Sequence, residues 1–318
     1  MTFKEYFKRN YEKGLWSMES LTLIYMLFTT VLIGIYWNDL AAPMDMIFTR
    51  IMMLAAIGFL YGIYRLYPCR ALRILRVVPP LLGLISWYPE TYDFCSQLPY
   101  LDHVFAGIDQ TLFGCQPALV FNTILSSTFW SEAFNMGYYA YYYMMGATLI
   151  FYLLCRYPEA DKAGFVFLAS FFLFYLIYEF LPVAGPQFYF KAVGVEAADT
   201  GDFPALGYYF RTHTEMLMPE VKGIFSQLVL GAQEIGERPT AAFPSSHVGM
   251  STVTMLLAWK THNKWLFWIM IPFYLLLCCG TVYIQAHYLI DSICGFFTAI
   301  LFFALTSWLY NLLHPSKL

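Results

Sequence analysis

Two apolar runs of this chain are bracketed by Ala242-Phe243-Pro244-Ser245-Ser246-His247-Val248-Gly249 and Tyr283-Ile284-Gln285-Ala286-His287-Tyr288-Leu289-Ile290-Asp291. The runs cover residues 245–261 and 264–284 and meet at a short turn between Lys260 and Lys264. Because a membrane helix needs about 20 mostly apolar residues, both runs are candidate spans. Two spans joined by a short turn are antiparallel, so His247 and His287 should return to one membrane surface.

The composition excludes a soluble globular domain. Hydrophobic residues make up 59% of the 318 residues and charged residues only 12%, against about 25% charged in soluble domains. With a net charge of −3, no basic surface indicates a nucleic-acid partner. We expect no removable signal peptide, because the polar first residues lead into a full-length apolar span. The seven cysteines lack metal-type spacing, although Cys95 and Cys115 share one loop and could pair.

The apolar pattern predicts an all-α fold, a polytopic membrane bundle of about eight transmembrane helices. The third span should be kinked or partly interfacial, because Arg73, Arg76 and Pro79-Pro80 interrupt it. The predicted spans are residues 17–37, 46–67, 71–88, 129–155, 163–184, 245–261, 264–284 and 287–311.

The 18 lysines and arginines predict the orientation of the bundle. With eight spans, 13 of them fall on one side, which the positive-inside rule makes cytoplasmic. The two histidines then face the non-cytoplasmic side, periplasmic in a bacterium or lumenal in a eukaryote. The five lysines and arginines on the histidine side are Arg50, Lys191, Arg211, Lys222 and Arg238.

The whole chain, residues 1–318, is predicted to be one integral membrane domain. N-terminal helices occupy residues 1–90, and an outer segment with an interfacial helix occupies residues 91–128. The catalytic helix core covers residues 129–311 and carries an outer loop over residues 185–244. A loop of that length is usually functional or disordered.

The two histidine motifs indicate phosphate chemistry. His287 and Asp291 are spaced i, i+4, so on a helix Asp291 could accept a hydrogen bond from one imidazole nitrogen and leave the other free. His287 would attack phosphorus, and His247 would act as the acid and base. Backbone N–H groups around Ser245 and Ser246, at a helix N-terminus, could bind phosphate oxygens. Two alternatives are structural buried histidines and a zinc site made of two histidines and Asp291.

These motifs resemble those of the type 2 phosphatidic acid phosphatase superfamily, Pro-Ser-(any)-His and His-x-x-x-Asp. The resemblance implies a six-helix core of lipid-phosphatase type preceded by additional N-terminal helices. It also implies a phosphohistidine on His287 and the use of no metal or other cofactor. The general pattern has an arginine six residues before the second histidine, where this chain has Thr281. An upstream Lys…Arg-Pro motif is also missing, and residues 182–187 occupy its place.

The departures make the chain more similar to the sphingolipid head-group transferase branch, which includes inositol phosphorylceramide synthase and sphingomyelin synthase. That similarity implies transfer of a phospho-head group, with phosphoinositol as the best candidate, from a glycerophospholipid in the bilayer to ceramide or dihydroceramide. The same histidines would serve a lipid phosphatase with water as acceptor, which is the second hypothesis. A transporter is the non-enzymatic alternative.

Several further residues are candidates for binding the substrate. Arg238 is the nearest possible replacement for the missing cations, and it could equally be a solvated loop residue. Tyr283 precedes His287 by one helical turn and could reach the phosphate or head group. Gly185, Pro186 and Gln187 could line the pocket or simply end the preceding helix.

Overall fold

The computed structural model describes residues 3–9, 14–218 and 221–315. Over these residues the chain is helical and contains no β-strand, which confirms the predicted all-α class. The eight long or spanning elements are α2 (Ser17–Ile35), α3 (Pro43–Leu66), α4 (Arg70–Leu75) with α5 (Val78–Cys95), α8 (Thr128–Cys155), α9 (Tyr157–Phe180), α13 (Ser246–Lys260), α14 (Lys264–Tyr283) and α15 (Leu289–Leu313). The short elements are α1 (Phe3–Tyr6), α6 (Asp102–Phe113), α7 (Pro117–Ile124), α10 (Pro186–Val193), α11 (Ala197–Thr200), η1 (Tyr209–Arg211) and α12 (Ile224–Gly236).

Each of the eight predicted spans coincides with a helical element. Within the described residues, six are long and apolar enough to cross a membrane: α2, α3, α4 with α5, α9, α14 and α15. α13 has only 15 residues, and α8 is long but carries six tyrosines, which lower its hydropathy. The chain is therefore an integral membrane protein built as a helical bundle.

The third predicted span is broken, as the sequence indicates. α4 ends at Leu75 and α5 begins at Val78, immediately before Pro79 and Pro80. Proline fits the first turn of a helix but cannot continue a preceding one, so the chain restarts at this point. α5 then continues to Cys95, beyond the predicted end at residue 88.

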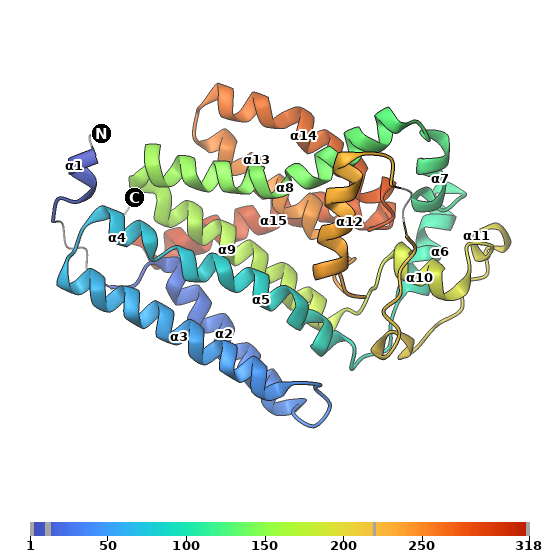
Figure 1. The fold of residues 1–318 in the computed structure, drawn as a ribbon, viewed down its shortest axis with the longest axis horizontal. Coiled ribbons are helices and arrows are strands. Elements are labelled where there is room, and N and C mark those ends of the chain that lie inside the picture. Colours follow the sequence, from blue (N-terminus) through green and yellow to red (C-terminus); the bar gives the residue numbers. More distant parts are fainter. Residues whose placement is uncertain (1–2, 10–13, 219–220, 316–318) are drawn as a thin grey trace.

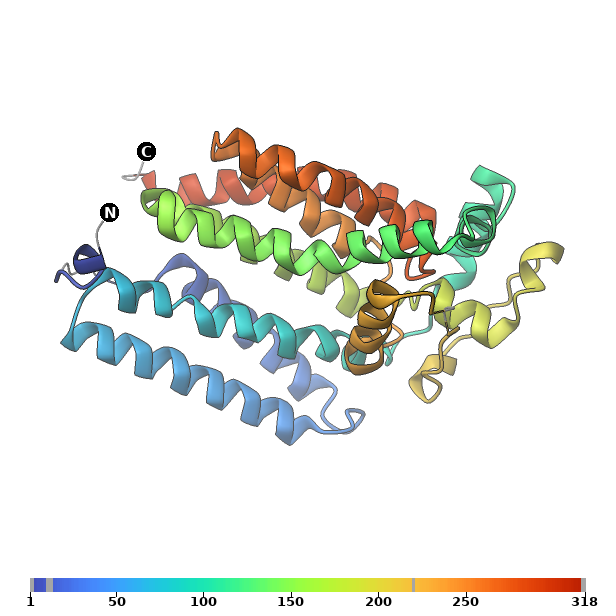
Figure 2. The same cartoon turned by 45° about the horizontal axis from the view of Figure 1, so that its top comes forward.

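α9 is the central helix of the bundle. It packs against α2 and α5 on one side and against α8, α13 and α15 on the other. In its most apolar window, 78% of the residues are buried. Figures 1 and 2 show α2 and α3 at one edge and α13 to α15 at the other, with α9 between them. The two histidine motifs and the N-terminal helices are thus joined through one buried helix.

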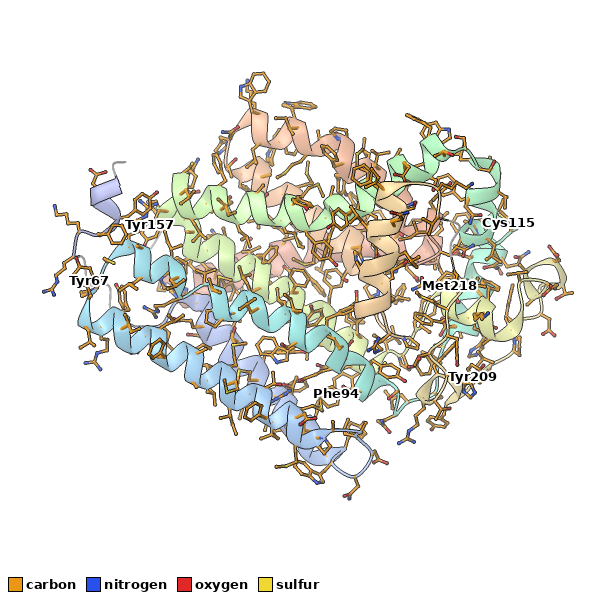
Figure 3. The ribbon with its side chains drawn as sticks, in the orientation of Figure 1. Tyr67, Phe94, Cys115, Tyr157, Tyr209 and Met218 are labelled. Atoms are coloured by element: carbon orange, nitrogen blue, oxygen red, sulfur yellow. The ribbon has the colours of Figure 1, made fainter. Side chains whose placement is uncertain are left out.

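The two ends of the bundle differ in what they carry. One end holds α1, α4 and the C-terminal end of α15, and the other holds α6, α7, α10 and α11 (Figure 1). In Figure 3, Tyr67 and Tyr157 mark the first end, while Cys115 and Tyr209 mark the second. Eleven of the 13 cations predicted to be cytoplasmic lie among the described residues, whereas Lys13 and Lys317 lie outside them.

The predicted outer loops contain more helix than the sequence suggests. Residues 91–128 form the end of α5 and then α6 and α7, and residues 185–244 contain α10, α11, η1 and α12. Glu132, the fifth residue of α8, holds α12, because its carboxylate accepts from Phe225 N at 2.9 Å and from Ser226 N at 3.0 Å. The possible disulfide does not form, since Cys95 and Cys115 are both free thiols.

Candidate active site

Three segments far apart in the sequence are hydrogen-bonded together at the end that carries α6 and α10. Ala242 N donates to Val183 O at 3.1 Å, which joins the Pro-Ser-Ser-His stretch to the segment after α9. Gln187 N donates to Gln285 O at 3.0 Å, which joins that same segment to the stretch before His287. A third bond, from Ser245 N to Asp291 O at 3.0 Å, links the two histidine motifs directly.

Two glycines allow this close approach. Gly185 has a φ of +101°, and a Cβ placed there would lie 2.7 Å from Ala286 O. Gly295 lies one turn after Asp291 in α15, and a Cβ there would lie 2.4 Å from Ser245 O. Larger residues would therefore separate the three segments.

Two carboxylates of α6 anchor the segment after α9 and the residues that follow His287. Asp102 accepts from Ala184 N at 2.9 Å, from Gly185 N at 2.8 Å and from the Tyr288 hydroxyl at 3.2 Å. Seven residues later on the same helix, Asp109 accepts from Leu289 N at 2.8 Å and from Ile290 N at 3.0 Å. Burial raises the pKa of Asp102 to about 6, although its hydrogen bonds oppose that shift.

His287 is oriented by a backbone carbonyl. Its Nδ1 lies 2.8 Å from Ala242 O, and the ring is only 4% exposed. A carbonyl can only accept, so Nδ1 carries the proton and Nε2 keeps its lone pair. Burial also lowers the pKa of His287, which lies between α14 and α15, to about 4. The neutral imidazole with a free Nε2 is the form that a nucleophile needs.

The expected hydrogen bond between His287 and Asp291 is absent, and this corrects the sequence interpretation. His287 precedes α15 rather than lying on it, so the two side chains do not share a helical face. Asp291 Oδ2 accepts from Tyr288 N at 2.9 Å and lies 3.8 Å from His287 Nδ1. Asp291 is fully buried, and its Oδ1 has no hydrogen-bond partner among the described residues. When it is ionised, Asp291 at that separation favours a positive imidazolium over a neutral ring.

His247 faces His287 from the first turn of α13. The ring centroids of the two histidines are 5.7 Å apart. Tyr138 and Tyr141 of α8 lie against the other side of His247, with centroid distances of 4.6 and 4.8 Å. Among the described residues, the two catalytic candidates thus come together at one point, as predicted.

The serines of the first motif have different surroundings. Ser245 is fully buried and is the N-cap of α13, since its Oγ accepts from Val248 N at 3.3 Å. Ser246 lines a cavity next to His247. The first N–H groups of a helix have no carbonyl partner within it, so the start of α13 can offer donors to an anion beside His247.

That cavity has a volume of about 470 Å³ and lies between α5, α8, α9 and α12. Its polar lining residues are Gln233, Glu237, Ser246, His247 and five tyrosines, and the rest of the lining is mostly aliphatic or phenylalanine. Two lining residues, Ile85 and Tyr142, are 72% and 55% exposed on the outside of the bundle, so the cavity reaches the lipid-facing surface. No lysine or arginine of the described residues contributes to this lining.

The remaining predicted binding residues are distributed unevenly around the site. Gly185, Pro186 and Gln187 lie in the segment joined to both motifs. The hydroxyl of Tyr283 donates to Leu125 O at 2.9 Å, and its ring packs on Phe121 and Phe134. Arg238 donates to Glu237 O at 2.8 Å and does not line the 470 Å³ cavity.

The sequence interpretation did not single out Asp102, Asp109 or Gln233. Asp102 and Asp109 are seven residues apart, which places them on one face of a helix, and that spacing was the available signal. Gln233 carried no signal, because a lone glutamine in an apolar helix matches no motif. Within the described residues, no group of three or more His, Cys, Asp or Glu side chains is arranged to hold a metal ion.

Comparison with protein families matches residues 103–305, well over half of the chain, to the family described as the PAP2 superfamily. The match includes both histidine motifs and Asp109 and begins one residue after Asp102. Comparison with curated proteins and with solved structures gave no significant match.

Proposed function

Because the chain belongs to the PAP2 superfamily, whose members are generally phosphatases or phosphotransferases, we propose that it is a membrane lipid phosphotransferase. It moves a phospho-head group from a glycerophospholipid to ceramide or dihydroceramide, and phosphatidylinositol is the preferred donor. The observation that carries this proposal is His287, whose Nδ1 is occupied by Ala242 O and whose ring lies 5.7 Å from that of His247.

The reaction has two displacements at phosphorus. His287 Nε2 attacks the donor phosphate, an Nε2–P bond forms, and the P–O bond to the diacylglycerol oxygen breaks as His247 gives that oxygen a proton. In the second step His247 removes the proton from the acceptor hydroxyl, whose oxygen attacks phosphorus and displaces His287. Asp291, 3.8 Å from Nδ1, stabilises the positive charge of the phosphorylated imidazole. The start of α13 binds phosphate oxygens.

The surroundings of the histidines favour a phosphodiester over a phosphomonoester. Thr281 stands where the general family pattern has an arginine; it is fully buried, with its Oγ1 3.0 Å from Ser292 Oγ. No described lysine or arginine lines the cavity at His247. A monoester dianion in an apolar surrounding needs more positive charge than a diester monoanion does. This argument supports transfer from a diester lipid over hydrolysis of a phosphatidic acid.

The cavity beside His247 supports a lipid acceptor. Its aromatic and aliphatic lining suits an alkyl chain, and its opening near Ile85 and Tyr142 allows entry from the bilayer. The charge count supports a site on the non-cytoplasmic side, since the eight-span prediction assigns 13 of the 18 lysines and arginines to the opposite side.

The test uses purified protein with head-group-labelled phosphatidylinositol, with and without ceramide. We expect ceramide-dependent transfer of label to a new lipid, and no transfer by the His287→Ala variant. Release of phosphate from phosphatidic acid with no ceramide-dependent transfer would instead identify a phosphatase and overturn the transferase proposal.

A further inference from the structure

The buried side chains of Gln187 and Gln233 form a hydrogen-bonded pair that the reaction above does not use. Gln187 belongs to the first turn of α10 and Gln233 to α12, and their side chains are joined by Gln233 Nε2 donating to Gln187 Oε1 at 3.2 Å. The two residues are 2% and 3% exposed. Gln187 Nε2 and Gln233 Oε1 have no partner among the described residues. Buried amide groups are normally satisfied, so this pair leaves one donor and one acceptor open for a ligand.

The pair lies at the catalytic site. Gln233 lines the 470 Å³ cavity together with His247. Gln187 N is bonded to Gln285 O, two residues before His287, and Gln187 O accepts from Leu217 N at 2.8 Å. Both backbone contacts hold Gln187 in place while its side chain reaches Gln233. A group bound by the pair would therefore belong to a molecule whose phosphate or hydroxyl is at the histidines.

The open atoms define the chemistry of that group. Exchanging the amide O and N of both glutamines leaves the bond between them intact and again leaves one donor and one acceptor, so the pattern is independent of the amide assignment. A hydroxyl, which both donates and accepts, matches such a pair, and so does a secondary amide. A phosphate oxygen only accepts, and a trimethylammonium group does neither.

We propose that the Gln187–Gln233 pair is a specificity site that binds a neutral hydroxyl or amide group of a lipid substrate. This inference rests on the proposed function, because it assigns the lipid that the same site selects. The group belongs either to a polyol head group of the donor or to the hydroxyl and amide of the acceptor. In both cases phosphatidylcholine, which has neither, makes no use of the pair.

Binding measurements on the His287→Ala protein test the pair without requiring catalysis. The probes are short-chain phosphatidylinositol, ceramide and phosphatidylcholine, measured with and without the added substitutions Gln187→Met and Gln233→Met. Methionine keeps the length of the side chain and removes both polar atoms. We expect an approximately tenfold or greater loss of affinity for one of the first two lipids and no change for phosphatidylcholine.

The lipid that loses affinity identifies the source of the hydroxyl or amide group. Gln116→Met is the matched control, because Gln116 is 1% exposed and also has an open Oε1, but it lies between α6 and α7 and outside the cavity lining. An unchanged affinity for all three lipids in the double variant, with a normal size-exclusion profile, would overturn the proposal.

Activity assays separate this inference from the proposed function. In the enzyme with an intact His287, the double variant should raise the KM for the identified lipid about tenfold or more and change kcat less. Suppose that the wild-type protein transfers nothing to ceramide, but the double variant still loses affinity for phosphatidylinositol or ceramide and not for phosphatidylcholine. The proposed function is then wrong and the specificity site stands. If transfer occurs and neither KM nor donor preference changes, the specificity site is wrong and the transferase stands.

Discussion

Carboxylates in the N-terminal helices and at the catalytic end of the bundle have different partners. In the N-terminal helices, Glu90 of α5 pairs with Arg50 of α3 through bonds of 2.7 and 3.0 Å. Glu19 of α2 pairs with Arg76 in the same way, with Nε to Oε1 at 2.9 Å. Here buried charges are matched by opposite charges, and whole helices are joined.

At the catalytic end, the carboxylates bind backbone N–H groups. Asp102 holds residues 184–185, Asp109 holds residues 289–290, and Glu132 holds the start of α12. These contacts join loops and helix ends rather than helix sides. Over the described residues, no lysine or arginine lines the cavity at His247, so the proposed mechanism relies on the start of α13 and on the histidines themselves to meet the charge of the phosphate.

The largest expected effect is the loss of His287. His287→Ala removes the nucleophile and leaves Ala242 O without its partner, so head-group transfer should fall to background in the labelled-lipid assay. The fold should survive, because only one side-chain bond is lost. Substantial residual transfer by a properly folded His287→Ala protein would contradict the phosphohistidine mechanism.

Breaking a charge pair of the N-terminal helices should reduce stability rather than catalysis. Arg50→Met leaves the buried Glu90 without its cation, which typically costs about 3–5 kcal/mol, and thermal unfolding in detergent should occur well below the wild-type temperature. Below that temperature kcat should be nearly unchanged. Arg211→Met is the control, since its pairing with Asp39 at 3.4 Å is exposed and should contribute less than about 1 kcal/mol. A large loss of kcat in the folded Arg50→Met protein would mean that the two regions are coupled.

Replacing Asp102 of α6 by asparagine should reduce kcat more than it reduces stability. Asp102→Asn replaces one acceptor oxygen with an NH₂ group facing a backbone N–H, at a cost of about 1–3 kcal/mol in positioning. We expect kcat to fall about 10- to 100-fold, with a smaller change in melting temperature. The matched control is Asp39→Asn on the exposed surface, which should behave as wild type. A lower melting temperature with an unchanged kcat would make Asp102 a purely structural residue.

The smallest predicted effect is a pH dependence set by Asp102. Its pKa is about 6, so protonation below that pH removes an acceptor from Ala184 N and Gly185 N, and kcat should fall up to about tenfold per pH unit. The contribution of Asp102 to folding stability changes with pH in the opposite direction to kcat. The folded pKa lies above the ordinary 3.8, so this contribution is fully present below pH 3.8 and is lost as the pH rises through about 6. Acidification should thus lower the activity, whereas the protonation of Asp102 that it causes favours the folded state.

The pH profile is best measured in a Glu237→Gln background, because burial raises the pKa of Glu237 to about 7 and its carboxyl lines the cavity. Adding Asp102→Asn should then remove the fall near pH 6 and leave only the one expected near pH 4, where His287 becomes protonated. A profile that keeps its fall near pH 6 in the double variant would assign that titration to another group.

Much of the fold could be predicted because its signals are local. Apolar runs of spanning length appear in the sequence itself, and the restart of the chain at Pro79 and Pro80 follows from the missing N–H of proline. The joint position of His247 and His287 also followed from local information, since a short turn between two spans makes them antiparallel. The family resemblance, carried by the two motifs, agrees with the superfamily match.

The partners of the site residues could not be predicted in this way. Asp291 stands four residues after His287, which suggested a pair on one helix, but α15 begins at Leu289 and the chain before it turns away. Likewise the position of Tyr283 one turn before His287 suggested a phosphate ligand, whereas its hydroxyl reaches Leu125, 158 residues away. Spacing along the chain cannot show where a helix begins or which distant carbonyl lies opposite.

By itself the sequence determined the membrane bundle, the shared end of the two histidines and the residue types of the chemistry, because hydropathy, proline and motif spacing act within a few turns of chain. Only the tertiary structure decided that Ala242 O orients His287, that Asp102 and Asp109 hold residues 184–185 and 289–290, and that Gln187 meets Gln233. Each of those contacts joins residues at least 45 positions apart. A hydrogen bond depends on atoms being within about 3 Å, and only the packing of the helices brings such residues that close.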